Sequence, residues 1–191
     1  MSASPASLRV SFGDEPLVLV DAADNVVGHA SKEAVHRGAG ILHRAFSIFV
    51  FSPDGALLLQ RRAPAKPLWP RHWSNSCCSH PRQGESYQTA VHRRLEEELG
   101  FDTDLEYLYR FQYHARYRDL GAERELCSVF VGVLRRPVTV RANDGEVEAW
   151  GWVRPERLDR DLHAAPQRYT PWLRLEWPRV RRQAAAPGAG A

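Results

Sequence analysis

The chain has 191 residues, a length that fits one domain built around a single hydrophobic core. Its 43% hydrophobic and 26% charged residues are typical of a folded globular protein and exclude extensive disorder. The formal charge of +3 is too small to indicate a nucleic acid or an anionic membrane as partner, and it is compatible with a small anionic substrate. Three cysteines, an odd number, predict no disulfide framework and favour the reducing cytoplasm.

The two ends of the sequence differ in composition from its middle. The first nine residues contain no long apolar segment, and no apolar run approaches the roughly 18 residues that span a bilayer. We therefore expect neither secretion nor membrane insertion. We expect residues 1–14 to form a flexible leader, residues 15–182 a single domain, and the Ala-, Gly- and Pro-rich residues 183–191 a flexible tail.

Two strand pairs joined by turn formers are predicted in the first third of the chain. Their apolar strands lie at residues 17–21, 26–28, 45–51 and 56–60. Between the pairs, Ser31 can cap a short helical turn, which glycine ends at position 38. Three prolines then predict an irregular loop over residues 63–72, which carries Lys66.

One central helix with strands on both sides of it is predicted in the rest of the chain. Apolar residues recur on one face of residues 86–99, and Gly100 follows as the stop. Further strands are expected at residues 105–117, 126–134 and 147–153, and proline starts two more helices at 155 and 171. This order of elements predicts an α+β fold in which mixed β-sheets are flanked by helices.

A thiol and an imidazole lie two positions apart, at Cys78 and His80. Alternate residues of an extended segment face the same side, so the two side chains can share a pocket, where they can activate a thiolate or bind a metal. Taken alone, Cys77 and Cys78 are more simply interpreted as small buried hydrophobic residues. Core packing is also the expectation for Cys127.

Two carboxylates and two further histidines have spacings that permit a metal site. Glu123 and Glu125 are expected in an extended segment just before a strand, where both side chains point to the same side. This arrangement suits the binding of a divalent cation. The other interpretation is an ordinary alternation of charges on the protein surface. His36 and His43 can each be an ordinary hydrogen-bonded histidine. Three histidines and two glutamates can supply the five or six ligands of Mn²⁺, Mg²⁺ or Zn²⁺. Because five other histidines are equally available, the residues alone do not choose the set.

The central helix concentrates acidic residues near its C-terminal end, where the helix dipole disfavours them. A bound metal ion would compensate for this placement. The alternative is a solvated helix face on which Arg94 and Glu98 pair four residues apart.

The same helix resembles part of the Nudix box, whose usual form is G-x5-E-x7-R-E-U-x-E-E-x-G-U with U apolar. The matching positions are Ser79, Glu85, Arg93, Arg94, Leu95, Glu97, Glu98, Gly100 and Phe101. Serine replaces the first glycine, and Arg94 replaces a glutamate that holds metal in hydrolytic members. A positive side chain repels a metal ion, so this departure weakens the hydrolase interpretation.

The same departures from the Nudix box are found in one branch of the Nudix superfamily, the type I isopentenyl-diphosphate isomerases. The chain resembles this branch from about Leu17 to Trp172. The resemblance is carried by residues 61–63 with Lys66 and Trp69, and by residues 73–81, 84–86, 111–113, 123–127 and 169–172. It implies a His₃Glu₂ metal site formed by His36, His43, His80, Glu123 and Glu125. It also implies that Glu98 helps to hold a Mg²⁺ ion on the substrate diphosphate.

The resemblance further implies how the substrate is bound and converted. Cys78 and Glu125 would transfer protons on opposite faces of the substrate, with Tyr113 hydrogen-bonded to the glutamate. Trp172 would stack against the hydrocarbon end. The implied diphosphate-binding cations are Lys32, Arg62, Lys66 and Arg94. Two of these are the only lysines of the chain, beside 24 arginines, which supports the assignment independently.

The implied reaction is the isomerisation of isopentenyl diphosphate to dimethylallyl diphosphate, with a small diphosphate as the only partner of a monomeric enzyme. Protonation of an alkene gives a carbocation, which requires a dry aromatic pocket and an opposed acid and base. Two other functions remain open. A Nudix diphosphohydrolase would release phosphate or a nucleoside monophosphate, and a non-catalytic binding module would keep its function after Cys78→Ala.

Overall fold

The structure, a computed structural model that describes residues 9–184, is built around β3 (His43–Phe51). Along one side, β3 pairs in parallel with β8 (Gly121–Val133) over its whole length. Its other side pairs in turn with three antiparallel strands. These are β1 (Pro16–Val20), β6 (Cys77–Ser79) and β4 (Leu57–Arg62). Strands from distant parts of the sequence therefore meet at β3.

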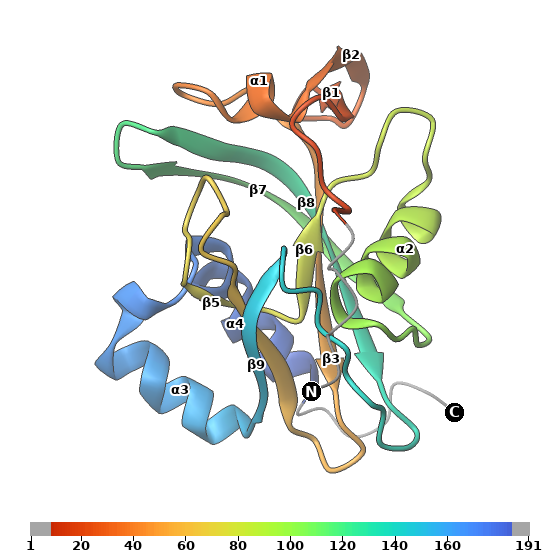
Figure 1. Ribbon diagram of the computed structural model, residues 1–191, viewed down its shortest axis with the longest axis vertical. Coiled ribbons are helices and arrows are strands. Elements are labelled where there is room, and N and C mark those ends of the chain that lie inside the picture. Colours follow the sequence, from red (N-terminus) through yellow and green to blue (C-terminus); the bar gives the residue numbers. More distant parts are fainter. Residues whose placement is uncertain (1–8, 185–191) are drawn as a thin grey trace, which may run out of the picture.

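The remaining strands extend this arrangement into a nine-stranded mixed sheet (Figure 1). They are β2 (Val26–Ser31) beside β1, β7 (Glu106–Tyr117) beside β8, and both β5 (Trp73–Ser74) and β9 (Val147–Val153) beside β4. β7 and β8 form a long antiparallel hairpin that curves over the upper part of the molecule in Figure 1.

Helices cover both faces of the sheet. α2 (Tyr87–Leu99) begins at the N-cap Ser86, whose side chain accepts from the Thr89 amide, and ends at Gly100, which has a φ of 70° that favours glycine. α3 (Pro155–Ala164) and α4 (Pro171–Ala184) lie on the opposite side of the sheet from α2 (Figure 1). The short α1 (Lys32–His36) follows β2, and a 3₁₀ turn, Pro166–Arg168, precedes α4.

Alternation of side chains along β3 divides the core into two layers. Phe46, Ile48 and Val50 pack with residues of α2, whereas Phe49 and Phe51 pack with residues of α3 and α4. The predicted α+β class, with mixed sheets flanked by helices, is confirmed.

Several boundaries differ from the predictions. β8 begins at Gly121 rather than at residue 126, because β7 continues to Tyr117 and pairs with β8 from its first residue. Glu123 and Glu125 therefore lie within the strand and not before it. α4 passes Pro178 and includes Gln183, a residue predicted to belong to the tail.

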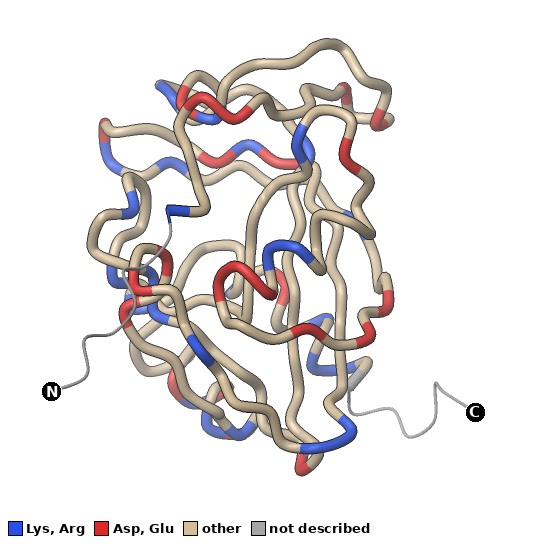
Figure 2. The backbone as a smooth tube through the Cα atoms, turned by 45° about the vertical axis from the view of Figure 1, so that its right-hand side comes forward, with Lys and Arg blue, Asp and Glu red and all other residues tan. Residues whose placement is uncertain are grey.

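The predicted leader and tail fall partly outside the part of the chain that is described. Residues 1–8 and 185–191 are not described, whereas residues 9–14 are. No helix within residues 9–184 is both long enough and apolar enough to cross a membrane. Basic and acidic segments are interspersed along this part of the chain, as Figure 2 shows, which agrees with the small formal charge of +3.

Candidate active site

A cavity of about 910 Å³ brings together residues that are far apart in the sequence. Its walls include all but two of the predicted site residues. Those in the wall are Lys32, His36, Arg62, Lys66, Cys78, His80, Arg94, Tyr113, Glu123, Glu125 and Trp172. The other two, His43 and Glu98, are buried next to wall residues, His43 beside Glu125 and Glu98 beside Arg94.

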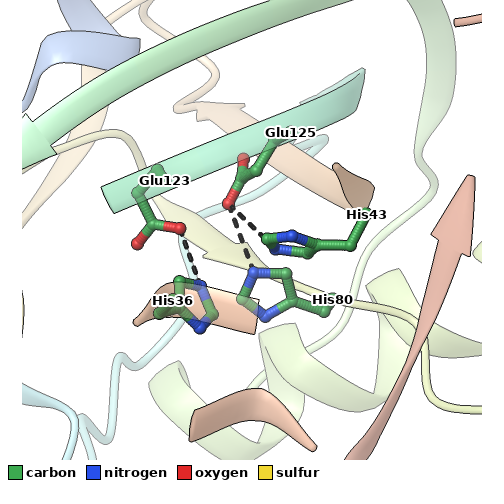
Figure 3. Close-up of side chains that lie close together, drawn as sticks. All are labelled: His36, His43, His80, Glu123 and Glu125. Atoms are coloured by element: carbon green, nitrogen blue, oxygen red, sulfur yellow. Dashed lines mark hydrogen bonds and ion pairs between the residues drawn. The ribbon is translucent and has the colours of Figure 1, made fainter. Parts of the chain in front are cut away.

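Three histidines and two glutamates converge at one end of this cavity (Figure 3). They are His36, His43, His80, Glu123 and Glu125, and one potential ligand atom from each lies within 4.8 Å of all the others. The structure therefore brings together the set that the resemblance implies. The other histidines do not join it; His72 and His114, for example, contact backbone carbonyl oxygens elsewhere.

The backbone fixes the direction of two of these imidazoles. His36 Nδ1 lies 2.6 Å from the carbonyl oxygen of Lys32, and His43 Nδ1 lies 2.7 Å from that of Ile41. Because a carbonyl oxygen only accepts, each Nδ1 carries the proton and donates it. The neutral ring of His43 then turns the lone pair of Nε2 toward the cluster, as a metal ligand must, whereas Nε2 of His36 faces Glu123.

A close backbone contact brings His36 to its carboxylate. A Cβ atom at Gly121 would lie 2.3 Å from the carbonyl oxygen of His36, so only glycine lets the start of β8 pass so near α1. Two residues further along β8, Glu123 Oε2 lies 2.7 Å from His36 Nε2.

The cluster fits a divalent metal ion. His43 Nε2 is buried and has no hydrogen-bond partner within residues 9–184, since Glu125 Oε1 is 3.9 Å away. His80 Nδ1 is buried without a partner in the same part of the chain, while His80 Nε2 lies 3.2 Å from Glu125 Oε1. A buried polar atom without a partner is costly, and a cation bound by these nitrogen and oxygen atoms would remove that cost.

The ionisation of the cluster is consistent with this role. Burial lowers the pKa of His43 to about 4 and that of His80 well below its ordinary value, so both rings are neutral at neutral pH. Burial opposes the charges of His36 and Glu123, but their mutual attraction outweighs it, raising the pKa of His36 and lowering that of Glu123. Burial and the nearby Glu123 charge raise the pKa of Glu125 well above its ordinary value. A divalent cation would reverse this last shift.

Tyr113 and Glu125 form the contact that the resemblance implies. They are directly opposite each other in the β7–β8 hairpin, and the Tyr113 hydroxyl donates to Glu125 Oε2 at 2.8 Å. Burial and the Glu125 charge raise the pKa of Tyr113 well above its ordinary value, so the phenol keeps its proton and remains a donor.

The two adjacent cysteines point to opposite faces of the sheet, as neighbouring residues of a strand must. Cys77 is fully buried in the core beneath α2, where it is the small hydrophobic residue that the simpler interpretation described. Cys78 instead lines the cavity and packs against the cluster that contains Tyr113 and Trp172. Cys127 is buried in that same cluster, as expected.

Aromatic side chains form the wall beside Cys78. Trp172, in the first turn of α4, is 3% exposed, and its indole N–H donates to Ser74 Oγ at 2.9 Å. Trp69 meets it edge to face with the ring centroids 5.4 Å apart. The Arg62 guanidinium lies 5.2 Å from the centre of the Trp172 ring, so a cation already contacts this aromatic surface.

A second group of charged residues in the cavity wall, which we call the diphosphate end, pairs basic side chains with acids. Lys32 Nζ contacts Glu15 at 3.7 Å, and Lys66 Nζ forms a very short contact with Glu146. Burial lowers the pKa of Lys32 to about 8, with a further contribution from Lys66.

Arg94 and Glu98 pair on α2, but not on a solvated helix face. Both are only 2% exposed, and Gln60 Nε2 also donates to Glu98 at 3.0 Å. The interpretation of this segment as a solvated helix face was therefore right about the Arg94–Glu98 pair, but wrong about its exposure to solvent. The acids at the end of α2 are neutralised by arginines, so their position does not by itself require a metal.

The other acids of the box-like segment are also paired. Arg93 binds Glu85 through two hydrogen bonds of 2.6 and 2.8 Å, and it contacts Glu97 at 3.0 Å. Glu85 and Glu97 are thus held by an arginine, which agrees with the weakened hydrolase interpretation.

Two parts of the cavity were not predicted from the sequence. One is the segment 9–13, where the Val10 carbonyl accepts from Arg94 at 3.2 Å. The other is Glu146, which contacts two of the predicted diphosphate-binding cations, Lys66 and Arg94. A backbone carbonyl has no sequence signal, and Glu146 is one of 23 acidic residues, so neither could be singled out.

Comparison with known proteins identifies related sequences. The NUDIX domain family model matches residues 41–173. The chain is 46% identical over 162 residues to the isopentenyl-diphosphate Delta-isomerase of Halorhodospira halophila, covering 84% of this chain and 91% of that protein. It is 43% identical over 165 residues to isopentenyl-diphosphate Delta-isomerase 1 of Photorhabdus laumondii, covering 85% and 93%.

A solved structure from Deinococcus radiodurans shares the fold. Its TM-score is 0.71 with 23% identity, and the match covers 86% of this chain and 98% of that one. At this identity the likeness bears on the fold alone. The sequence relatives and the family model together show that this chain belongs to the isopentenyl-diphosphate Delta-isomerase family of NUDIX-domain proteins.

Proposed function

We propose that this chain isomerises isopentenyl diphosphate to dimethylallyl diphosphate by adding one proton and removing another. Membership of the isomerase family supports this function. The observation that carries it is the shared cavity, which brings together a thiol, a hydrogen-bonded carboxyl group, a His₃Glu₂ cluster and basic residues that are paired with acids.

The reaction needs two proton-transfer groups. A proton added to the terminal CH₂ of the alkene leaves a tertiary cation at the neighbouring carbon, and loss of a proton from the next CH₂ gives the trisubstituted alkene. Cys78 and Glu125 are the two groups that we assign to these transfers, since both line the cavity. Burial raises the pKa of the Cys78 thiol to about 12, although Arg62 opposes this, so the thiol carries its proton at neutral pH.

Tyr113 and Trp172 serve the same step in different ways. The Tyr113 hydroxyl holds Glu125 by a hydrogen bond and orients it. The face of Trp172 stabilises positive charge on the hydrocarbon, an interaction worth roughly 2 kcal/mol when water is excluded. The surrounding aromatic side chains keep water from capturing the cation.

We place the diphosphate among the basic residues of the cavity. Lys32, Arg62, Lys66 and Arg94 all line it and supply positive charge. Glu98, beside Arg94, is the residue that we assign to a Mg²⁺ ion carried by the diphosphate. When bound, that ion neutralises phosphate charge.

At the His₃Glu₂ cluster we propose Mn²⁺, Zn²⁺ or Mg²⁺. Three imidazole nitrogens favour Mn²⁺ or Zn²⁺ over Mg²⁺, which prefers oxygen ligands and keeps bound water. A divalent ion there would supply positive charge beside Glu125 and favour its ionised form.

We also propose that the enzyme acts as a monomer in the cytoplasm, on a small diphosphate rather than on nucleic acid or at a membrane. The cysteines at 77, 78 and 127 are free, which supports a reducing compartment. The limits of 15–182 for the domain stay a prediction.

The test is incubation of isopentenyl diphosphate with the enzyme and Mg²⁺ in D₂O. Deuterated dimethylallyl diphosphate without release of phosphate is the expected product. Glu125→Gln keeps the shape of the side chain but removes the carboxyl group that exchanges a proton with the substrate, and it should abolish deuterium incorporation. Release of inorganic phosphate would instead indicate a hydrolase and contradict the proposal.

A further inference from the structure

Glu146 is a buried acid at the diphosphate end whose role the mechanism above does not explain. It lies directly before β9, is 5% exposed and lines the cavity. Its Oε2 atom contacts both Lys66 Nζ and, at 2.9 Å, one terminal nitrogen of Arg94. Burial opposes ionisation of Glu146, but the charges of Lys66 and Arg94 outweigh this and hold its pKa below the ordinary value.

The hydrogen bonds of Arg94 show why this contact matters. One terminal nitrogen donates to the Val10 carbonyl and to Glu97, and the other donates to Glu98 and to Glu146. Each terminal nitrogen carries two hydrogens, so all four are used. Only Nε–H, which is buried, has no partner within residues 9–184. Arg94 can bind a diphosphate through its terminal nitrogens only after one of these acceptors leaves.

Glu146 is the acceptor best placed to leave. Glu97 is also bound by Arg93, the Val10 carbonyl also accepts from Arg82, and Glu98, which we assign to Mg²⁺, is also held by Gln60. Glu146 lines the cavity, and its departure would release Lys66 as well as Arg94. One movement would therefore free two of the cations that we assign to the diphosphate.

We propose that Glu146 is an internal counter-ion, which neutralises Lys66 and Arg94 in the ligand-free pocket as the diphosphate does when it is bound. As a consequence, the pocket binds the magnesium complex of a diphosphate more tightly than the metal-free anion. This inference rests on the proposed function, in that it places a diphosphate at Lys66 and Arg94. A metal-free diphosphate must displace a carboxylate that remains nearby and repels it. A diphosphate that carries Mg²⁺ brings a cation to which the displaced carboxylate is attracted.

The test is calorimetric titration of inorganic pyrophosphate into the full chain, in metal-depleted buffer and with saturating Mg²⁺. Wild type should bind the magnesium complex more tightly. Glu146→Gln should bind metal-free pyrophosphate about ten-fold more tightly than wild type does, because one like-charge repulsion is removed. The preference for the magnesium complex should shrink by a similar factor.

Glu148→Gln is the matched control. Glu148 lies two residues further along on β9, pairs with Arg61 and Arg71 and does not line the cavity, so this variant should keep the wild-type preference. An unchanged preference in Glu146→Gln would overturn the inference. If circular dichroism shows that Glu146→Gln is not folded, Glu146→Ala removes the same charge. Equal binding of both forms by wild type would overturn the inference without any variant.

The outcome can be separated from that of the proposed function, because pyrophosphate cannot be isomerised. If wild type isomerises isopentenyl diphosphate while Glu146→Gln keeps the preference, the inference fails and the function stands. If the preference shifts as expected but no isomerisation occurs, the diphosphate site stands and the proposed reaction fails.

Discussion

The two ends of the cavity hold buried charge in opposite ways. At the His₃Glu₂ end, His43 Nε2 and His80 Nδ1 have no hydrogen-bond partners in the part of the chain that the structure describes, and their rings are neutral. At the other end, Arg94 uses all four of its terminal hydrogens, and Lys66 is paired with Glu146.

This difference separates a site that is ready for its ligand from one that must exchange partners. The histidine end is positioned by strands and backbone carbonyls, and a cation would have to replace only the proton that holds His36 to Glu123. The diphosphate end is neutralised internally, which keeps buried arginine and lysine from lying unpaired. We expect variants at the first end to affect chemistry and metal affinity, and variants at the second to affect folding stability and anion binding.

The largest effect is expected from Cys78→Ala. Loss of a proton-transfer group should lower the turnover of isopentenyl diphosphate by about 10²- to 10⁴-fold. Deuterium incorporation into the product, followed by NMR, measures this loss. Cys77→Ala is the control, because Cys77 faces the α2 core and should change stability rather than turnover. Equal losses of turnover in both variants would show that Cys78 does not act in the cavity.

The cysteine pair also shows how much of the site could be predicted from the sequence. Alternation along an extended segment predicts that Cys78 and His80 share one side and that Cys77 faces the other. In the structure Cys78 and His80 both line the cavity, whereas Cys77 lies in the core beneath α2. Most strands and helices also followed from apolar periodicity and from turn and cap residues, but the short strands β5 and β6 were not predicted. β8 began earlier than expected, because Gly121 and its polar neighbours do not resemble a strand until they are paired with β7.

The remaining parts of the site depend on the tertiary structure. His36 and His43 meet only because β8 passes close to α1 at Gly121, so spacing alone could not select them among eight histidines. The resemblance to a family selected them. Glu146 was missed because its partners, Lys66 and Arg94, are 80 and 52 positions away in the sequence.

At the diphosphate end, Arg94→Met should destabilise the fold by about 3–5 kcal/mol, because it leaves Glu98 and Glu146 buried without their shared cation. Denaturant unfolding measures the change. Arg93→Met is the control and should cost less, since Arg93 is more exposed than Arg94. The double variant Arg94→Met with Glu98→Gln should regain part of the loss. No recovery would mean that unpaired charge is not the cause.

At the histidine end, His43→Asn should reduce the affinity for Zn²⁺ or Mn²⁺ by about 100-fold, while folding stability without metal changes far less than in Arg94→Met. Competition with a chromophoric chelator measures the affinity. His114→Asn, which alters a histidine outside the cluster, is the control. If the metal affinity of His43→Asn is unchanged, His43 does not bind the metal ion. The proposed difference between the histidine end and the diphosphate end would then be wrong.

The protein also buries a second kind of carboxyl group. Glu176 is fully buried beneath the histidine end, with its Oε1 atom 3.5 Å from Cys127 Sγ, and it forms no ion pair within residues 9–184. Burial raises its pKa from 4.5 to about 8, whereas the pKa of Glu146, which is paired with cations, is lowered. The two buried acids should therefore respond to pH in opposite directions.

The sign for Glu176 follows from proton linkage. Between pH 4.5 and about 8 the folded protein retains a proton that the unfolded chain has lost, so the contribution of Glu176 to stability falls as pH rises through this window. The slope inside it is roughly 1.4 kcal/mol per pH unit. Below the window both states are protonated and the contribution is constant.

Glu176→Gln should remove this dependence, since an amide does not titrate. Relative to wild type, the variant should become progressively more stable between about pH 5 and about pH 8 in denaturant unfolding experiments. Glu156→Gln, at an exposed position, should instead follow the wild-type curve. If the curves of wild type and Glu176→Gln run parallel, Glu176 is ionised in the folded protein, and a cation or water must then stabilise it as Lys66 and Arg94 stabilise Glu146.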